Sequence, residues 1–147
     1  MRSGAWLVLC GLALSGPLGN GFDLSANPSH AAIVAGGVGI ASVLLAAESL
    51  VRAGTRVELL YGARTAELLV EAPRFEKAGC SLALATDDGS AGHRGYVTDL
   101  LERRDEMPEM ILACGPSPML RAVGRIARER NVRAQLDDRL RALHGPD

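Results

Sequence analysis

The sequence has few of the residues that build disulfide frameworks or metal centres. Its three cysteines, Cys10, Cys80 and Cys114, lie far apart and form no C-x-x-C pair. Its three histidines form no H-E-x-x-H motif. These patterns argue against a disulfide-stapled secreted scaffold and give no support to a zinc or iron–sulfur ligand set. We therefore expect no bound metal and a reducing compartment.

The sequence also lacks an excess of either charge. Sixteen Lys and Arg residues stand against seventeen Asp and Glu residues, which gives a formal net charge of -1. Such a balance provides no field that would attract nucleic acid or an anionic membrane surface. Hydrophobic residues make up 48% of the 147 residues, enough for the core of one domain. We expect a packed domain with a small partner, and neither nucleic acid nor membrane among its ligands.

Glycine, by contrast, is concentrated in a stretch that organises the chain. Residues 33–42 read Ile-Val-Ala-Gly-Gly-Val-Gly-Ile-Ala-Ser. An apolar run, closely spaced glycines and an amphipathic pattern are typical of a strand, a turn that approaches phosphate, and a helix N-terminus. Gly37 and Gly39 fit the first two glycines of the dinucleotide motif G-x-G-x-x-G, whereas Ser42 stands at the third. On this stretch alone, a nucleotide turn and a buried strand with an ordinary glycine turn are equally open.

The rest of the chain shows an alternation of strand and helix patterns. Further strands are expected over residues 57–61, 81–86, 110–113 and 131–136, and helices over residues 40–53, 65–75, 96–101 and 119–127. Thr65 can cap the second helix, and Pro73 should end or kink it. This order predicts an α/β fold with a five-stranded parallel sheet and helices on both faces.

A parallel sheet brings the loops that follow its strands to one edge. The loops at Gly36, Gly62, Asp87 and Gly115 should therefore converge on a single site. We assign this sheet to residues 29–136, with a connector and strand remnant over residues 1–28 and a polar tail over 137–147.

The first 28 residues contain two segments that each allow two interpretations. Residues 5–14 are apolar and follow Arg2, a pattern that fits either a short export signal or a core strand. Residues 16–22, Gly-Pro-Leu-Gly-Asn-Gly-Phe, fit either a connector that closely approaches another group or an ordinary linker.

Five segments taken together resemble the ferredoxin reductase-like flavoprotein superfamily. They are residues 16–22; Ala-Gly-Gly-Val-Gly-Ile-Ala over 35–41; Tyr-Gly-Ala-Arg over 61–64; Ala-Thr-Asp-Asp-Gly-Ser over 85–90 with Gly-Tyr-Val-Thr-Asp-Leu-Leu over 95–101; and Ala-Cys-Gly-Pro-Ser-Pro-Met over 113–119. They follow in order from about residue 16 to residue 136, which no single glycine motif could offer. Within the superfamily, the chain resembles the electron-transfer subunit of dihydroorotate dehydrogenase.

The resemblance implies a two-lobed reductase of which this chain holds the NAD(H)-binding lobe. In the family a β-barrel holds FAD, and its signature would precede residue 1, so residues 5–14 would be at most its last strand. The family's C-terminal cysteine cluster carries a [2Fe-2S] centre, but here residues 137–139 read Asp-Asp-Arg and no cysteine follows. We therefore expect NAD(H) and FAD as cofactors, with an incomplete FAD site and no [2Fe-2S] cluster.

The resemblance also implies roles for particular residues. Gly36, Gly37, Val38 and Gly39 would line the cofactor pyrophosphate, and Arg64 would contact the adenosine part. Asp87, Asp88 and Gly89 would shape the adjoining wall. Cys114, Gly115 and Pro116 would lie beside the nicotinamide, with Cys114 as a neutral neighbour of the hydride path or, without the motif, a small buried residue. Gly16, Pro17, Leu18 and Gly19 would lie near the flavin.

The function implied is that of a cytoplasmic oxidoreductase component in pyrimidine biosynthesis. It would pass electrons from NADH through FAD to the catalytic subunit of dihydroorotate dehydrogenase or to another flavin or iron–sulfur acceptor. The alternatives are a non-catalytic or truncated nucleotide-binding module and, from the apolar start alone, an exported α/β ligand-binding protein. No acid closes the second strand, since Glu58 lies near its beginning, so the choice between NAD and NADP follows from the family alone.

Overall fold

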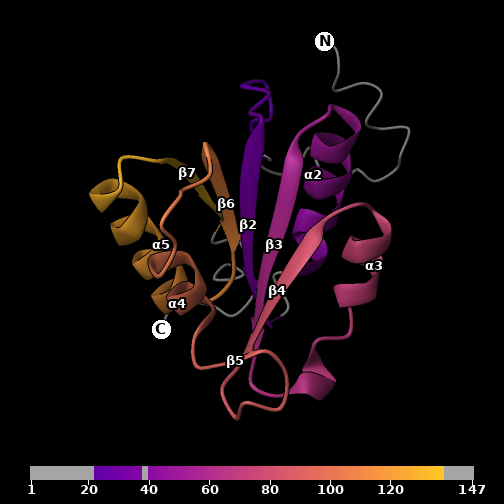
Figure 1. The fold of residues 1–147 in the computed structure, drawn as a ribbon, viewed down its shortest axis with the longest axis vertical. Coiled ribbons are helices and arrows are strands. Elements are labelled where there is room, and N and C mark those ends of the chain that lie inside the picture. The colour runs from indigo at the N-terminus through magenta and orange to yellow at the C-terminus, as the bar shows by residue number, and fades with distance from the viewer. Residues whose placement is uncertain (1–21, 38–39, 138–147) are drawn as a thin grey trace.

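The computed structural model describes residues 22–37 and 40–137, and these form a parallel sheet covered by helices on both faces (Figure 1). Its strands are β2 (His30–Gly36), β3 (Arg56–Ala63), β4 (Ser81–Thr86), β5 (His93–Arg94), β6 (Met110–Cys114) and β7 (Arg133–Asp137). Its helices are α2 (Ile40–Arg52), the 3-10 turn η3 (Ala66–Leu68), α3 (Ala72–Lys77), α4 (Val97–Glu102) and α5 (Ser117–Glu129). The predicted α/β class and parallel sheet are confirmed.

The strand order β5-β4-β3-β2-β6-β7 contains one reversal of direction. From β2 the chain adds β3, β4 and β5 on one side, then crosses back to add β6 and β7 on the other. Every pair is parallel, with Ile33 opposite both Leu59 and Leu112 in the centre. The reversal falls between β2 and β6, the point at which open α/β sheets leave a crevice for ligands.

Two apolar clusters fill the space between the sheet and its helices. Helices α2 and α3 cover one face and α4 and α5 the other, to the right and left of the sheet in Figure 1. Because neighbouring residues of a strand point to opposite faces, Ile33 packs in the first cluster and Val34 in the second. All five residues of β6 are buried, as a central parallel strand requires.

The number of strands differs from the prediction: the described sheet has six rather than five. The extra strand, β5, is two residues long and lies in the segment that the sequence predicted to be a loop. His93 and Arg94 pair with Ala85 and Thr86 at the end of β4. Two residues are too few to carry an alternation of apolar and polar side chains, so pattern alone could not reveal this strand.

The predicted helix over residues 65–75 is wrong in its details. Thr65 precedes only the short turn η3, and its side chain makes no capping hydrogen bond. Pro73 lies in the first turn of α3 and does not end a helix. Proline is well tolerated at that position, because the first amides of a helix have no carbonyl partner within it.

Strand β7 starts two residues later than predicted. Asn131 has a φ of +55° and forms the turn that ends α5. The amide N–H of Val132 donates to the Ala127 carbonyl at 2.8 Å, and that of Asn131 to the Arg128 carbonyl at 3.2 Å. Asparagine is one of the few residues that adopt this left-handed conformation readily, and it is a common helix stop.

The segment before the sheet is attached to its far strand. The amide N–H of Asp23 donates to Gln135 Oε1 at 2.7 Å, and Gln135 Nε2 donates to the Asp23 carbonyl at 2.7 Å. This reciprocal pair joins residues that are 112 positions apart. The predicted strand remnant over residues 5–14 and nearly all of the polar tail lie outside the described residues.

Candidate functional site

A large pocket opens at the carboxyl edge of the sheet, at the reversal of strand order. Its volume is about 1020 Å³, at the upper end of the range for small-molecule sites. The loops after β2, β3, β4 and β6 all contribute to it, as the topology predicted. Its lining comprises Gly36, Gly37, Ile40, Tyr61, Gly62, Ala63, Arg64, Leu68, Val70, Asp87, Gly95, Tyr96, Val97, Thr98, Pro116, Pro118, Met119 and Ala122.

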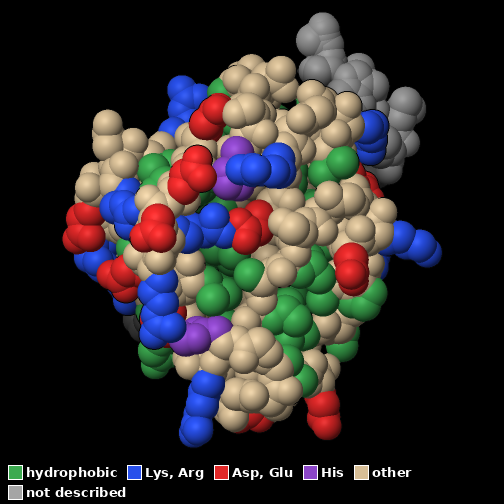
Figure 2. Space-filling model, in the orientation of Figure 1, with side chains coloured by type: hydrophobic (Ala, Val, Ile, Leu, Met, Phe, Trp, Pro, Cys, Tyr) green, Lys and Arg blue, Asp and Glu red, His purple; other side chains and the backbone are tan. Residues whose placement is uncertain are grey.

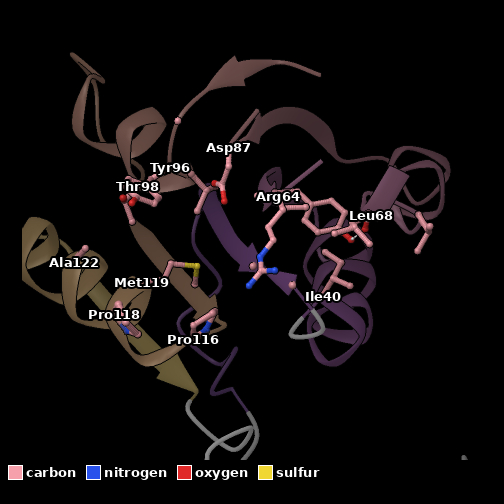
Figure 3. A pocket seen from close by; sticks show the side chains of 18 residues that line it. Ile40, Arg64, Leu68, Asp87, Tyr96, Thr98, Pro116, Pro118, Met119 and Ala122 are labelled. Carbon is pink, nitrogen blue, oxygen red and sulfur yellow. Dashed lines mark hydrogen bonds between the residues drawn. The ribbon is translucent and has the colours of Figure 1, made fainter. Parts of the chain in front are cut away.

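Two glycines, Gly36 and Gly115, lie close together at the bottom of the pocket, one on each side of the point where the strand order reverses. A Cβ at Gly115 would lie 3.2 Å from the Gly36 backbone nitrogen and 2.7 Å from Met119 Cε. A Cβ at Gly36 would lie 2.9 Å from Met119 Sδ. A side chain at either position would displace the Met119 thioether, which covers both glycines from α5, and at Gly115 it would also press on the Gly36 backbone. In Figure 3 this side chain extends into the cavity beside Pro116.

Gly37 differs from these two glycines because its surroundings are open. A Cβ there would meet no atom of the described chain within 4 Å, but its φ of +58° lies in the left-handed region that favours glycine. Helix α2 begins at Ile40, three positions further along the chain, and has no acidic residue in its first turn. An exposed turn of this kind before a helix N-terminus offers backbone N–H groups to an anion.

Two charged side chains stand on the pocket wall. Arg64 follows β3 and Asp87 follows β4, and both are exposed. Within the described part of the chain, the Arg64 guanidinium makes no hydrogen bond or ion pair, and in Figure 3 it extends into the cavity. A cation in a cavity beside an open glycine favours an anionic ligand.

Apolar side chains form the two rims of the same pocket. Leu68 and Val70 are exposed on one side, and Tyr96, with 72% of its surface exposed, stands on the other. Exposed apolar side chains of this size beside a cavity are typical of a ligand or partner surface. An elongated ligand with flat apolar rings and a central anionic group would suit this arrangement.

Asp88 and Gly89 do not line the pocket. The Asp88 carboxylate accepts hydrogen bonds from the backbone N–H and hydroxyl of Ser90, at 2.9 and 2.6 Å. These bonds lower the pKa of Asp88. The Ser90 hydroxyl in turn accepts a hydrogen bond from the Ala66 amide at 2.8 Å. Asp88 thus joins the loop after β4 to η3 behind the wall.

Cys114 also lies beneath the pocket rather than on its surface. It is the last residue of β6, is 2% exposed, and packs with the apolar cluster under α2 and α3. Of the residues predicted beside the nicotinamide, Pro116 lines the cavity, whereas Gly115 lies beneath the Met119 side chain and is not part of the lining. The predicted role of Cys114 beside a hydride path stays a prediction.

Several pocket residues had no role assigned from the sequence. The clearest are Tyr96 and Met119, each of which stood in a segment quoted for the family resemblance. An aromatic residue directly after a glycine in the loop that follows a strand was the available signal for Tyr96. Of the predicted site residues, Val38, Gly39, Gly16, Pro17, Leu18 and Gly19 lie outside the described part of the chain.

A second, smaller hollow of about 410 Å³ lies at the opposite, amino edge of the sheet. Its charged groups are largely paired: Arg104 forms an ion pair with Glu58, and Arg56 contacts His30 Nδ1 at 3.2 Å. Burial lowers the pKa of His30, and the Arg56 charge adds to the effect. Figure 2 shows basic, acidic and histidine side chains interspersed in this upper region. The pairing makes this hollow a weaker candidate than the glycine-floored pocket.

The described part of the chain contains neither a metal-binding group of side chains nor a membrane-spanning helix. Among residues 22–37 and 40–137, no three His, Cys, Asp or Glu side chains are grouped so that they could hold a metal ion. No helix in the same ranges is both long and apolar enough to cross a bilayer.

Comparison with known protein families matches the part of the chain that forms the pocket. The model of the oxidoreductase NAD-binding domain matches residues 33–125, which begin in β2 and end within α5. This span contains the floor, both charged wall residues and both rims of the pocket.

Two curated relatives are both named as electron transfer subunits. A probable dihydroorotate dehydrogenase B (NAD(+)) electron transfer subunit from Methanothermobacter thermautotrophicus is 40% identical over 125 residues, or 85% of this chain and 46% of the relative. The dihydroorotate dehydrogenase B (NAD(+)) electron transfer subunit of Bacillus caldolyticus is 39% identical over 127 residues, or 85% of this chain and 49% of the relative. The chain thus spans about half the length of these relatives.

A solved structure supports the fold assignment. The NADH-dependent reduced ferredoxin-NADP oxidoreductase, described in connection with flavin-based electron bifurcation, aligns with a TM-score of 0.66 and 33% identity. The alignment covers 75% of this chain and 40% of that chain. The ferredoxin reductase-like lobe predicted from the sequence is therefore confirmed as the fold of this chain.

Proposed function

The chain belongs to the oxidoreductase NAD-binding domain family, and we propose that it binds NADH in the pocket at the carboxyl edge of its sheet. The observation that carries this proposal is the Arg64 guanidinium, which has no hydrogen-bond or ion-pair partner among residues 22–37 and 40–137 and extends into the pocket that Gly36 and Gly37 line. The pyrophosphate would lie near the Gly37 turn, where a positive side chain and backbone N–H groups can meet its charges. The remaining volume suits the two nucleoside halves.

The residues present fit this ligand in three respects. The Gly37 turn is open on its outer side, so a phosphate can approach the backbone. The rims carry exposed apolar groups, Leu68 and Val70 facing the side of Tyr96, that can shield flat rings from water. Pro116 and Met119 border the pocket beside β6, where the nicotinamide would lie if the adenosine occupies the side of Arg64.

We further propose that the bound nicotinamide supplies hydride to a flavin held by another part of the same protein or by a second chain. The residues of this lobe would bind and orient the dinucleotide and exclude water from its ring, while the redox chemistry belongs to the cofactors. The relatives that support this step are electron transfer subunits about twice as long as this chain. FAD and a dihydroorotate dehydrogenase catalytic subunit are the proposed next carriers, in the cytoplasm where NADH is supplied. The prediction that no [2Fe-2S] cluster is bound remains part of this proposal. Asp88 and Gly89, which do not line the pocket, would shape the wall that adjoins Arg64 from behind.

A non-catalytic nucleotide-binding module is the second candidate. It needs only the pocket described above, whose lining can hold a dinucleotide without a flavin beside it. It would bind NADH in the same pocket and pass no electrons.

One anaerobic experiment separates the two candidates. The purified chain is mixed with FAD and NADH, and the flavin absorbance band is followed over time against FAD and NADH without protein. Faster bleaching with the protein supports an autonomous reductase. NADH binding without faster bleaching favours the module, or a lobe that needs its flavin partner. Repeating the assay with a purified dihydroorotate dehydrogenase catalytic subunit and its flavoprotein half distinguishes these last two.

A further inference from the structure

The Met119 side chain covers the bottom of the pocket and is itself open to the cavity. A Cβ built on Gly36 would lie 2.9 Å from its sulfur, and one built on Gly115 would lie 3.0 Å from the sulfur and 2.7 Å from the terminal methyl group. The thioether is therefore packed against both glycines on one side. On its other side it lines the cavity and is partly exposed, with the sulfur drawn in yellow in Figure 3.

The backbone of Met119 is held in place by the start of α5. Met119 is the third residue of this helix, and the amide N–H of the next residue, Leu120, donates to the Pro116 carbonyl at 3.1 Å. Leu120 is 5% exposed and packs in the apolar cluster beneath α4 and α5. A change in the size or polarity of the Met119 side chain must therefore be accommodated inside the cavity.

The other two methionines in the described part of the chain are placed differently. Met110 is 1% exposed within β6, and its sulfur lies 3.6 Å from Gln135 Nε2, which donates to it. Met107 is partly buried against the apolar cluster beneath α4 and α5 and does not line the pocket. A small oxidant that enters the pocket therefore meets the sulfur of Met119.

We propose that Met119 is a modification site at which hydrogen peroxide closes the pocket to dinucleotides. A sulfur lone pair attacks one peroxide oxygen, an S–O bond forms and the O–O bond breaks, and the products are methionine sulfoxide and water. The thioether is oxidised by two electrons, and the peroxide is reduced by the same two. The inference rests on the proposed NADH site and adds a way in which its occupancy is controlled.

The added oxygen has room only on the side of the ligand. The glycine side of the thioether is filled, so the S–O group projects into the cavity or pushes the rest of the side chain there. Its oxygen is the negative end of a strong dipole, and it would stand beside Pro116, where the nicotinamide would lie. An apolar surface that suits a flat ring thus becomes a polar obstacle. NADH should bind at least about tenfold more weakly to the oxidised chain.

The test measures oxidation and binding on the same sample of the full chain. The protein is treated with hydrogen peroxide, catalase stops the reaction, and peptide mass spectrometry gives the fraction of each methionine that carries one added oxygen. Calorimetry then gives the affinity for NADH. Met119 should gain oxygen before Met110, and tight NADH binding should be lost in step with Met119 oxidation. Saturating NADH during the treatment should slow the oxidation of Met119 but not that of Met107.

Met119→Leu keeps an apolar side chain of similar volume without the sulfur. Whatever affinity for NADH this variant has before treatment, peroxide should change it by less than about twofold, since leucine forms no sulfoxide. Met107→Leu is the matched control, because it removes a sulfur outside the pocket lining and should lose NADH affinity on peroxide treatment as wild type does. The buried thiols of Cys80 and Cys114 remain in both variants, so a loss caused by thiol oxidation would also occur in Met119→Leu.

Unchanged NADH affinity after full conversion of Met119 to the sulfoxide, or an equal peroxide effect in Met119→Leu, would overturn this inference while leaving the NADH site in place. If Met119→Leu fails to fold, repair of the oxidised wild type by methionine sulfoxide reductases A and B is decisive. Recovery of NADH affinity supports the inference, and no recovery once Met119 is reduced overturns it. An untreated chain that binds no NADH would overturn the proposed function and this inference with it.

Discussion

The backbone of Gly115 lies so close to that of Gly36 that a Cβ on Gly115 would come within 3.2 Å of the Gly36 nitrogen. Gly36 is the last residue of β2 and Gly115 directly follows the last residue of β6, the two strands that flank the reversal of strand order. Their contact closes the floor of the pocket, and Met119 lies over both of them. The absence of two side chains thus lets the ends of β2 and β6 lie close together and leaves room for Met119 above them.

Gly115→Ala should reduce stability and weaken NADH binding. The added methyl group would displace the flexible Met119 side chain into the cavity and press on the Gly36 backbone, at a cost of about 1–3 kcal/mol in the free energy of unfolding. Urea unfolding measures the first effect and calorimetry with NADH the second.

The matched control is Gly124→Ala in the middle of α5. Its new methyl group would meet Leu136 Cδ1 at 3.3 Å, and that side chain is exposed and can move. Replacing a helical glycine should raise the free energy of unfolding by about 0.5–1 kcal/mol. Equal effects of the two substitutions would contradict the close contact at the pocket floor.

Gly62→Ala should destabilise the chain by about 1–3 kcal/mol, because its Cβ would lie 2.8 Å from the Cβ of Val97. That atom belongs to a buried, β-branched residue at the start of α4 and cannot rotate away. Val97→Ala keeps the obstructing atom, so the double variant should be no more stable than Gly62→Ala alone. Recovery of the wild-type urea midpoint in the double variant would show that the close packing has been misjudged.

Arg64→Ala should weaken NADH binding about tenfold, as expected for a hydrogen bond between charged groups. The loss should shrink as salt is raised, since screening already weakens this interaction in the wild type. Arg128→Ala removes the same charge from the exposed side of α5, outside the pocket lining, and should change the affinity by less than about twofold. Calorimetric titrations at two salt concentrations provide the comparison, and equal losses for both arginines would argue against a direct contact.

The chain should lose stability in acid through four carboxyl groups. Hydrogen bonds from nearby serines lower the pKa values of Asp23, Asp88 and Glu109, and the His93 contact lowers that of Asp99. A carboxyl whose pKa is lower in the folded chain than in the unfolded chain stabilises the fold at pH values above its unfolded-state pKa. This contribution is lost as the pH falls through the folded-state pKa. The melting temperature should therefore fall below about pH 4.

Asp88→Asn tests this assignment because its carboxyl lies outside the pocket. The variant should melt at a lower temperature than wild type near neutral pH, and the difference should narrow as the pH is lowered through the acid range. If the difference in melting temperature between Asp88→Asn and wild type stays constant from pH 7 down to the lowest pH measured, the ionised Asp88 carboxylate contributes nothing to stability.

Elements with a long or strongly apolar local pattern could be predicted from the sequence. The helix that begins at Ile40 and the strand Ser81–Thr86 agree with the structure because their patterns depend only on neighbouring residues. The strand β5 could not be predicted, since its two residues become a strand only by pairing with β4. Pro73 was misjudged because proline suits the first turn of a helix as well as the residue after its end.

The candidate site was predictable in its position but not in its surface. Parallel topology alone brings the loops of Gly36, Gly62, Asp87 and Gly115 to one edge. Whether a given side chain faces the cavity depends on packing that sequence does not encode locally, so Asp88 proved to bond with Ser90 behind the wall. For the same reason Met119, which covers the glycine floor, could not be assigned to the site beforehand.

The most direct test of the account is an amide NMR titration of the chain with NADH. Binding in the proposed pocket should shift the signals of Gly36, Arg64, Tyr96 and Gly115 in a saturable way, while those of Ser29, Thr55 and Glu109 at the amino edge stay in place. AMP should reproduce the shift at Arg64 without the one at Gly115. Shifts confined to the amino edge, or none at saturating NADH, would contradict the central claim that this pocket is a dinucleotide site.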